Sequence, residues 1–184
     1  MADRNTRMLD ALFNAFEGQP VLEGMRTEVV EGNVHMTPQR DTHWHVTWDI
    51  VRQLPRHSQR VFSNVRIDYP GHLNGLCSDV ALLTESAQSD DEDRWSYQDV
   101  RFVAEVITRG TAAIDHGPKK TAYATAGVAV YLIADPYQGT CHIHTPPKDG
   151  AYTHTWPTVA FGEEVDLTDT PLGLALKTDT FPRD

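Results

Sequence analysis

The pattern of apolar and polar residues in the first third of the chain predicts two helices separated by a β-hairpin. Apolar residues recur with helical spacing over residues 7–16 and 42–54, and Pro55 would end the second helix. Between these segments, residues 26–34 alternate loosely between polar and apolar positions and end on Gly32-Asn33, which is typical of a tight turn between two strands.

The middle of the chain predicts several strands with one helix inserted among them. Helical spacing over residues 116–126 ends before Gly127, which is a common helix-terminating residue. The expected strands cover residues 60–69, 79–83, 100–107, 128–134, 140–145 and 152–156. The order strand, helix, strand over residues 100–134 predicts a parallel crossover, whereas the hairpins predict antiparallel pairs. We therefore expect an α/β fold with a mixed sheet.

Two polar stretches interrupt this pattern. Residues 85–98 are acidic, with Ser89-Asp90-Asp91-Glu92-Asp93 at their centre, and we interpret them as a solvated loop. After Pro146-Pro147 the sequence is rich in turn-forming residues. We expect residues 171–184 to be exposed, either packing on a partner or remaining free.

The composition indicates a globular protein without a membrane-spanning helix. The chain has 184 residues, of which 40% are hydrophobic and 23% charged, and this suits a single globular domain. No apolar run approaches the ~20 residues of a membrane-spanning helix. The polar first residues lead into no apolar stretch, so we expect no secretory signal and a cytoplasmic protein. The formal net charge of -10 argues against a protein that coats nucleic acid, but not against an enzyme that uses a local basic surface and a bound metal.

The two cysteines and two histidines of a predicted strand are potential metal ligands, but their spacing does not indicate a metal site. Cys77 and Cys141 have no partner at metal-ligand spacing, so we expect two buried thiols. His142 and His144 alternate along a predicted strand and would face the same side, as zinc-binding histidines can. No third ligand stands at a suitable spacing, which argues against a zinc site.

Acidic residues in predicted strands point to a different chemistry. Glu105 lies within the apolar segment VRFVAEVI, where a buried carboxylate costs several kcal/mol unless a cation compensates it. The alternative is a solvent-facing position on a half-exposed strand. Asp79 begins the preceding strand, and by itself would be a cap or turn residue. Adjacent strands would place the two carboxylates side by side, the minimum for holding Mg²⁺, which can activate water and stabilise charge on a phosphate.

Further polar residues could complete such a site. Asp115, Lys119 and Tyr123 recur every four residues and would share one face of a helix. They could form a surface ion pair of little energetic consequence, or the lysine could point at the metal site and orient water or phosphate. Glu28, in the first hairpin, could supply another acidic group or be an exposed strand residue.

The segments SDVALL at residues 78–83 and VRFVAEVITRGTAAIDHGPKKTAYATAGVAVYLIADPYQGTCHIHT at residues 100–145 resemble the Uma-two family of restriction-endonuclease-like proteins. Those proteins look like members of the PD-(D/E)xK nuclease superfamily. The similarity covers residues 76–145 and extends more weakly to Glu28-Val-Val-Glu-Gly32 and His43. The resemblance implies a restriction-endonuclease-like α/β domain, a mixed sheet core flanked by helices. Residues 1–25 would form an amino-terminal helical part, 26–145 the nuclease core and 146–184 a turn-rich extension.

The resemblance also implies site residues. The family's metal-binding aspartate and glutamate map onto Asp79 and Glu105, with Glu28 as an additional acidic residue. Its lysine normally follows the glutamate by two residues, where this chain has Ile107, and in the resembling family it lies on the next helix. That position points to Lys119, with Lys120 as the alternative because of a possible one-residue slip.

This chain departs from the family pattern at two places. Ser78 stands where a proline usually precedes the aspartate, and residues 108–111 read Thr-Arg-Gly-Thr instead of serine-proline-serine-threonine. The second departure borders the expected site, so substrate contacts made by that loop would differ.

The function implied is a Mg²⁺-dependent endonuclease, with Mn²⁺ as a substitute, that acts on DNA as a homodimer and leaves 5′-phosphate ends. Two other functions fit the sequence. A non-catalytic module that binds DNA or protein would agree with the negative charge and the altered loop. A metal-dependent hydrolase of small phosphate esters would agree with an acidic surface.

Overall fold

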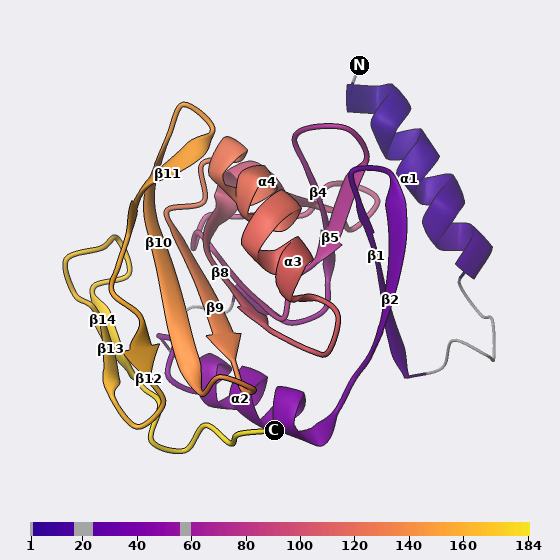
Figure 1. The fold of residues 1–184 in the computed structure, drawn as a ribbon. Coiled ribbons are helices and arrows are strands. Elements are labelled where there is room, and N and C mark those ends of the chain that lie inside the picture. Colours follow the sequence, from indigo (N-terminus) through magenta and orange to yellow (C-terminus); the bar gives the residue numbers. More distant parts are fainter. Residues whose placement is uncertain (1, 17–23, 56–59) are drawn as a thin grey trace.

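A mixed β-sheet lies at the centre of the molecule (Figure 1). The computed structural model describes residues 2–16, 24–55 and 60–184. The sheet has seven strands in the order β11-β10-β9-β8-β6-β3, with β12 paired to β10. Its strands are β3 (Val61–Phe62), β6 (Val80–Leu83), β8 (Val100–Val106), β9 (Val130–Asp135), β10 (Thr140–Lys148), β11 (Ala151–Thr155) and β12 (Val159–Ala160). The β8 and β9 strands are parallel and the other pairs antiparallel, which confirms the predicted crossover and mixed sheet.

A second sheet of five strands has the order β2-β1-β5-β4-β7. Its strands are β1 (Met25–Val30), β2 (Asn33–Pro38), β4 (Arg66–Tyr69), β5 (Asn74–Cys77) and β7 (Trp95–Ser96). The predicted β1–β2 hairpin is confirmed, but its turn lies one residue earlier, at Glu31 and Gly32. Both turn residues have positive φ angles, of 49° and 78°, as the twist of a two-residue hairpin turn requires.

Helical segments cover both faces of the central sheet, and one further helix, α1 (Ala2–Phe16), packs on the second sheet. The others are α2 (Asp41–Val51) and a continuous helical segment made of α3 (Ala112–Ile114), the π-helical η3 (Asp115–Lys119) and α4 (Lys120–Thr125), with a short 3₁₀ turn η2 (Tyr97–Asp99) elsewhere. The segment from α3 to α4 runs across β8 and β9, and α1 lies beside the β1–β2 hairpin (Figure 1). No helix in the described part of the chain is long and apolar enough to span a membrane.

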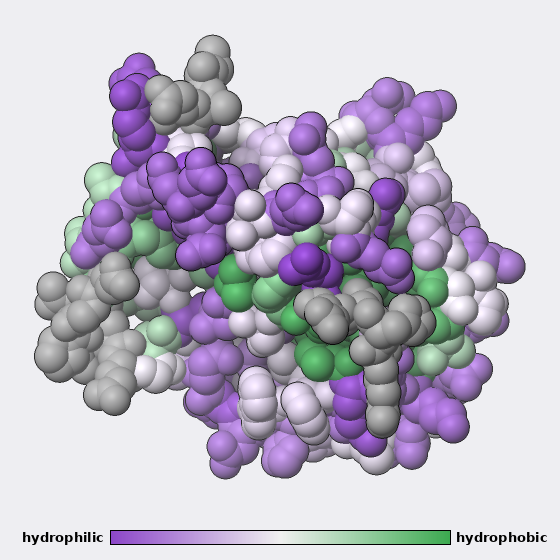
Figure 2. Space-filling view, turned by 180° about the vertical axis from the view of Figure 1, so that it is seen from behind, coloured by the Kyte–Doolittle hydropathy of each residue, from purple (hydrophilic) through white to green (hydrophobic). Residues whose placement is uncertain are grey.

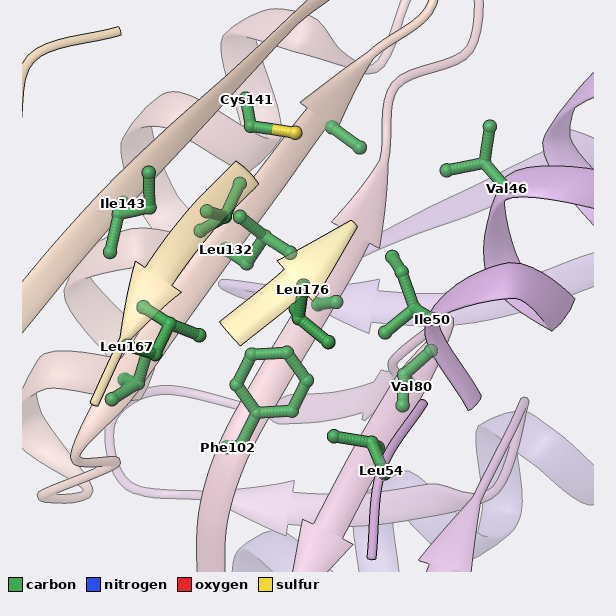
Figure 3. Close-up of a cluster of buried hydrophobic side chains, with 14 of the residues drawn as sticks. Val46, Ile50, Leu54, Val80, Phe102, Leu132, Cys141, Ile143, Leu167 and Leu176 are labelled. Atoms are coloured by element: carbon green, nitrogen blue, oxygen red, sulfur yellow. The ribbon is translucent and has the colours of Figure 1, made fainter. Parts of the chain in front are cut away.

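Alternate residues of β8 supply two separate cores, as the two-residue period of a strand requires. Phe102 and Ala104 pack toward α2 and a carboxy-terminal hairpin of β13 (Glu164–Leu167) and β14 (Leu174–Lys177). Figure 3 shows this core, with the hairpin lying over the sheet next to α2. Val103 packs on the other face, with Tyr123 of α4 and residues of the second sheet.

The carboxy-terminal residues are therefore not the exposed tail expected from the sequence. Leu176 is fully buried and Phe181 is 7% exposed, and both belong to the core under α2. The error arose because turn-rich sequence hides the short alternating strands β13 and β14. Much of the outer surface is hydrophilic, with a smaller apolar area on the face shown in Figure 2.

Other differences from the sequence predictions are local. The strand expected over residues 60–69 divides into β3 and β4, which belong to different sheets, because Asn64 has a φ of 58° and turns the chain. The β5 strand was missed, and the loop expected over residues 85–98 ends in the short β7. The helix expected over residues 116–126 begins earlier, at Ala112. The two cysteines are free and buried, as predicted.

Candidate functional site

Asp79, immediately before β6, lies across from Glu105 on the adjacent strand β8. The pairing of Val80 with Ala104 in the antiparallel β6–β8 ladder places the residue before Val80 across from the residue after Ala104. Both carboxylates are buried, with exposed fractions of 2% and 0%. The Asp79 Oδ2 atom accepts a hydrogen bond of 2.7 Å from the backbone N–H of Val106, which fixes this carboxylate against β8.

Glu105 points into the core between the central sheet and α4, so the alternative of a solvent-facing position is wrong. The Tyr123 hydroxyl donates a hydrogen bond of 2.5 Å to Glu105 Oε1 and lies 3.0 Å from Ser78 Oγ. Burial raises the pKa of the Tyr123 phenol well above its usual value, so it remains a donor. Tyr123 therefore orients one oxygen of Glu105 and leaves the other available.

Lys119 connects three carboxylates. Its Nζ atom lies 2.8 Å from Glu28 Oε1, 3.1 Å from Glu105 Oε1 and 3.4 Å from Asp115 Oδ1. Burial lowers the pKa of a lysine, but these carboxylates outweigh burial and raise the pKa of Lys119 above its usual value. The side chain is fully buried, whereas Lys120 is half-buried, so Lys119 is the lysine placed at the carboxylates.

The helical segment that carries Lys119 has a π-helical turn. This turn spans Asp115–Lys119 and contains Pro118, which has no N–H to donate to the preceding turn. Single π-helical turns often occur at functional sites. The predicted sharing of one helix face by Asp115, Lys119 and Tyr123 is confirmed, since all three side chains are buried on the side of Glu105.

Arg26 is a charged residue of the site that the sequence analysis missed. It is 2% exposed, its Nη1 atom contacts Asp79 Oδ1, and the same nitrogen lies 3.6 Å from Glu105 Oε2. Arg26 and Glu28 are two residues apart on β1 and so face the same side of the strand. This spacing, once Glu28 was considered, was the signal that could have pointed to it.

His43 is the second contact of Asp79. It lies near the start of α2, is 3% exposed, and its Nε2 atom is 2.9 Å from Asp79 Oδ1. Burial alone would raise the pKa of Asp79, but Arg26, His43 and the Val106 N–H together hold it well below the usual range. Asp79 is therefore an ionised carboxylate with several compensating contacts.

The buried cluster carries more negative than positive charge. Its ionisable carboxylates are Glu28, Asp79, Glu105 and Asp115, and its permanent cations are Arg26 and Lys119. Leaving His43 aside, full ionisation of these described residues sets four negative charges against two positive ones, a formal charge of −2 that one divalent cation would balance and that is reached only above the raised pKa values of Glu105 and Asp115. Burial, reinforced by Asp79, raises the pKa of Glu105 to about 8 although Lys119 and Arg26 oppose the rise.

The carboxylate oxygens of the cluster suit a hard divalent ion. The guanidinium of Arg26, however, lies between Asp79 and Glu105. Glu28 Oε2 and Glu105 Oε2 are buried and accept no hydrogen bond within the described residues. Carboxylate oxygens are the ligands that Mg²⁺ prefers. In the same part of the chain, no three acidic, histidine or cysteine side chains form a group that could hold a metal ion. An ion shared by Asp79 and Glu105 would require Arg26 to move.

The histidines of β10 take part in other contacts. His142 packs edge-on against His116 with ring centroids 5.0 Å apart. The His144 Nδ1 atom lies 3.1 Å from Thr155 Oγ1, and its ring stacks on Tyr131.

Comparison with known proteins identifies the family. The sequence pattern of a family described as "Uma2: Putative restriction endonuclease" matches residues 13–179. The chain belongs to the Uma2 family. The fold of this Uma2 protein is similar to the crystal structure of a "putative nuclease belonging to DUF820" from Anabaena variabilis ATCC 29413, with a TM-score of 0.65. That likeness has 13% sequence identity and covers 84% of this chain and 88% of the other. No curated protein matches the Uma2 chain.

Proposed function

We propose that this Uma2 protein is a metal-dependent nuclease of the PD-(D/E)xK type that hydrolyses phosphodiester bonds in DNA. One observation carries the proposal: Asp79 and Glu105 are buried side by side on adjacent strands, with Lys119 Nζ 3.1 Å from Glu105. Membership of the Uma2 family and the nuclease-like fold support the nuclease class. The family description supports DNA as the substrate.

Asp79 and Glu105 would hold the ion, with Glu28 nearby as a further acidic group. Mg²⁺, or Mn²⁺ in its place, would supply Lewis acidity and lower the pKa of a bound water. Tyr123 holds Glu105 Oε1, and the Val106 N–H holds Asp79 Oδ2, so the backbone and a phenol set the orientation of both carboxylates. Such prior orientation reduces the rearrangement needed when the substrate binds.

Lys119 acts as a cation in this proposal and not as a base. Its raised pKa keeps the ammonium group charged, so it has no lone pair with which to accept a proton. A charged ammonium group has three N–H donors, and it can orient a water molecule or a phosphate oxygen and stabilise the negative charge that develops there. Glu28 and Asp115 hold Lys119 in place, at 2.8 Å and 3.4 Å.

Two other candidate functions are each favoured by one observation. The guanidinium of Arg26 already compensates Asp79 and Glu105, as it would in a nuclease-fold module that binds DNA or protein without cutting. The net charge of -10 favours a hydrolase of small phosphate esters, because a negative protein repels a polyanion.

Cleavage of supercoiled plasmid tests the proposal. We expect the parent protein to nick the plasmid in Mg²⁺ or Mn²⁺ and not in a chelator, and Glu105→Gln to abolish nicking. The matched control is Glu164→Gln, which changes an exposed glutamate of β13 and should cut like the parent. Equal nicking by Glu105→Gln and the parent would refute the site.

Two further measurements separate the alternatives. Absence of nicking together with absence of Mn²⁺ binding in calorimetry would favour the binding module. Hydrolysis of a chromogenic phosphodiester without any nicking would favour the small-ester hydrolase.

A further inference from the structure

The guanidinium of Arg26 lies at the position that a metal ion would occupy in the proposed site. Its Nη1 atom contacts Asp79 Oδ1 and lies 3.6 Å from Glu105 Oε2, so one guanidinium nitrogen spans the two carboxylates expected to share an ion. A metal ion bound to those oxygens would take this position. Two cations cannot occupy it together, because at contact distance in a buried site their repulsion is large.

The charge balance allows Arg26 to change its partners without leaving the site. When all four carboxylates are ionised, the cluster has a formal charge of −2 with Arg26 included, so a divalent ion could be added while Arg26 stays. Once the ion takes the carboxylates, however, the buried guanidinium needs another anion, because an uncompensated buried charge is strongly unfavourable. Glu28 and Asp115 are nearby carboxylates that would remain, and a substrate phosphate at the metal would be a further anion for the guanidinium to bind.

The side chain has the donors for that exchange. Arg26 Nε is buried and donates no hydrogen bond within the described residues, so the guanidinium has binding capacity in reserve. The planar arrangement of guanidinium N–H groups matches the oxygens of a phosphate and allows two parallel hydrogen bonds.

The strand around Arg26 is paired on one side only. In the described structure β1 pairs with β5 only at Val29 and Gly75, three residues beyond Arg26. Arg26 itself pairs with Thr37 of β2, so this end of the hairpin is held by one neighbouring strand. A small shift of the hairpin, or a change of side-chain rotamer, would withdraw the guanidinium from Asp79.

We propose that Arg26 exchanges partners during the reaction cycle: it neutralises Asp79 and Glu105 in the metal-free protein, yields their oxygens to the divalent ion, and then binds the phosphate of the substrate. This inference rests on the proposed function. It assigns Arg26 two roles, as a competitor of the metal and as a substrate-binding residue.

Calorimetric titration with Mn²⁺ tests the first role. Arg26→Gln removes the competing charge, and we expect it to bind Mn²⁺ at least about tenfold more tightly than the parent does. The matched control, Arg101→Gln, changes an exposed arginine on β8 and should leave the affinity unchanged. A Mn²⁺ affinity of Arg26→Gln equal to or weaker than that of the parent would overturn the inference and leave the proposed function standing. Failure of the parent and both variants to bind Mn²⁺ would overturn both proposals.

Binding of a fluorescent duplex oligonucleotide in Ca²⁺, followed by anisotropy, tests the second role. Ca²⁺ also takes oxygen ligands, and a gel would verify that the duplex is intact. We expect Arg26→Gln to bind the duplex at least about tenfold more weakly than the parent and Arg101→Gln, because a charge-assisted pair of hydrogen bonds to phosphate is lost. Equal binding by all three proteins would overturn the second role.

The same experiments remain decisive if Arg26→Gln is unfolded without metal. Folding of that variant on addition of Mn²⁺, followed by circular dichroism, would support the inference, because a ligand that binds only the folded state stabilises it. A variant that stays unfolded in millimolar Mn²⁺ would refute it. The second variant, Arg26→Lys, keeps the charge but not the planar donors, and it should retain the Mn²⁺ affinity of the parent while losing affinity for the duplex.

Discussion

Replacement of Glu105 by glutamine should stabilise the metal-free protein at alkaline pH. The variant removes one negative charge from a buried cluster of formal charge −2, while its amide oxygen can still accept the hydrogen bond from Tyr123. Removing a negative charge that no cation compensates should raise the free energy of unfolding. Removing one partner of a balanced ion pair would lower it.

The magnitude follows from the pKa of Glu105. Burial raises this pKa from 4.5 to about 8, so the folded state holds a proton that the unfolded state releases. The contribution of Glu105 to parent stability therefore falls as the pH rises from about 4.5 to about 8 and is level above that window. At about 1.4 kcal/mol for each tenfold change in proton affinity, the upper bound is about 5 kcal/mol. Relaxation of the buried cluster reduces this, and we expect the glutamine variant to gain about 2–3 kcal/mol at pH 9.

Urea denaturation in a chelator, at pH 5 and at pH 9, measures this effect. Parent and Glu105→Gln should differ little at pH 5 and should separate at pH 9, with the variant more stable. In saturating Mn²⁺ the order should reverse, because only the parent gains the free energy of metal binding. A variant that is less stable than the parent at pH 9, by an amount independent of pH, would refute the account of the buried charges.

Three further predictions concern the contacts around the site and the core under α2. Asp79→Asn should destabilise the protein by about 3 kcal/mol, because it leaves Arg26 buried without the ionised carboxylate of Asp79. Calorimetry should detect no Mn²⁺ binding by this variant, and normal binding would exclude Asp79 as a ligand. Tyr123→Phe should lower the free energy of unfolding by about 1–3 kcal/mol and reduce nicking, since Glu105 loses its fixed orientation; unchanged nicking would show that this orientation is not needed. Leu176→Ala should lower the free energy of unfolding by about 2–5 kcal/mol in urea denaturation, and Leu174→Ala should lower it less because Leu174 is only half-buried. Equal losses would contradict the packing of β14.

The sequence was sufficient to predict the parts of the site that lie on long regular elements. Strong β-forming residues over 100–107 placed Glu105 on a strand, and the succession of strands placed Asp79 beside it. The helical spacing of Asp115, Lys119 and Tyr123 was equally visible. In each case the local pattern of side chains contained the information, because strands and helices have fixed periods. The proposed roles of these residues await the experiments above.

The remaining parts depend on contacts between elements far apart in the sequence. Arg26 lies on a hairpin strand, where a charged residue is indistinguishable from an exposed one until the hairpin is placed against Asp79. The β5 strand is short and contains Gly75, which makes its sequence resemble a turn. The burial of Leu176 depends on the packing of β14 under α2, and no local sequence pattern predicts a contact between segments so far apart.

The packing of the carboxy-terminal hairpin against α2 has a consequence for synthesis of the chain. The Gln53 side chain, just after α2, donates to the Lys177 carbonyl at 3.0 Å and accepts from the Lys177 N–H at 2.7 Å. Every charged side chain of the site precedes residue 120 and Tyr123 follows soon after, yet α2, which carries His43, lacks the cover of its apolar face until residues 164–181 have been made. A ribosome-bound chain that has completed all its site residues would still lack part of the core beneath α2. Premature termination in this region should therefore yield aggregation-prone fragments that are cleared by proteolysis.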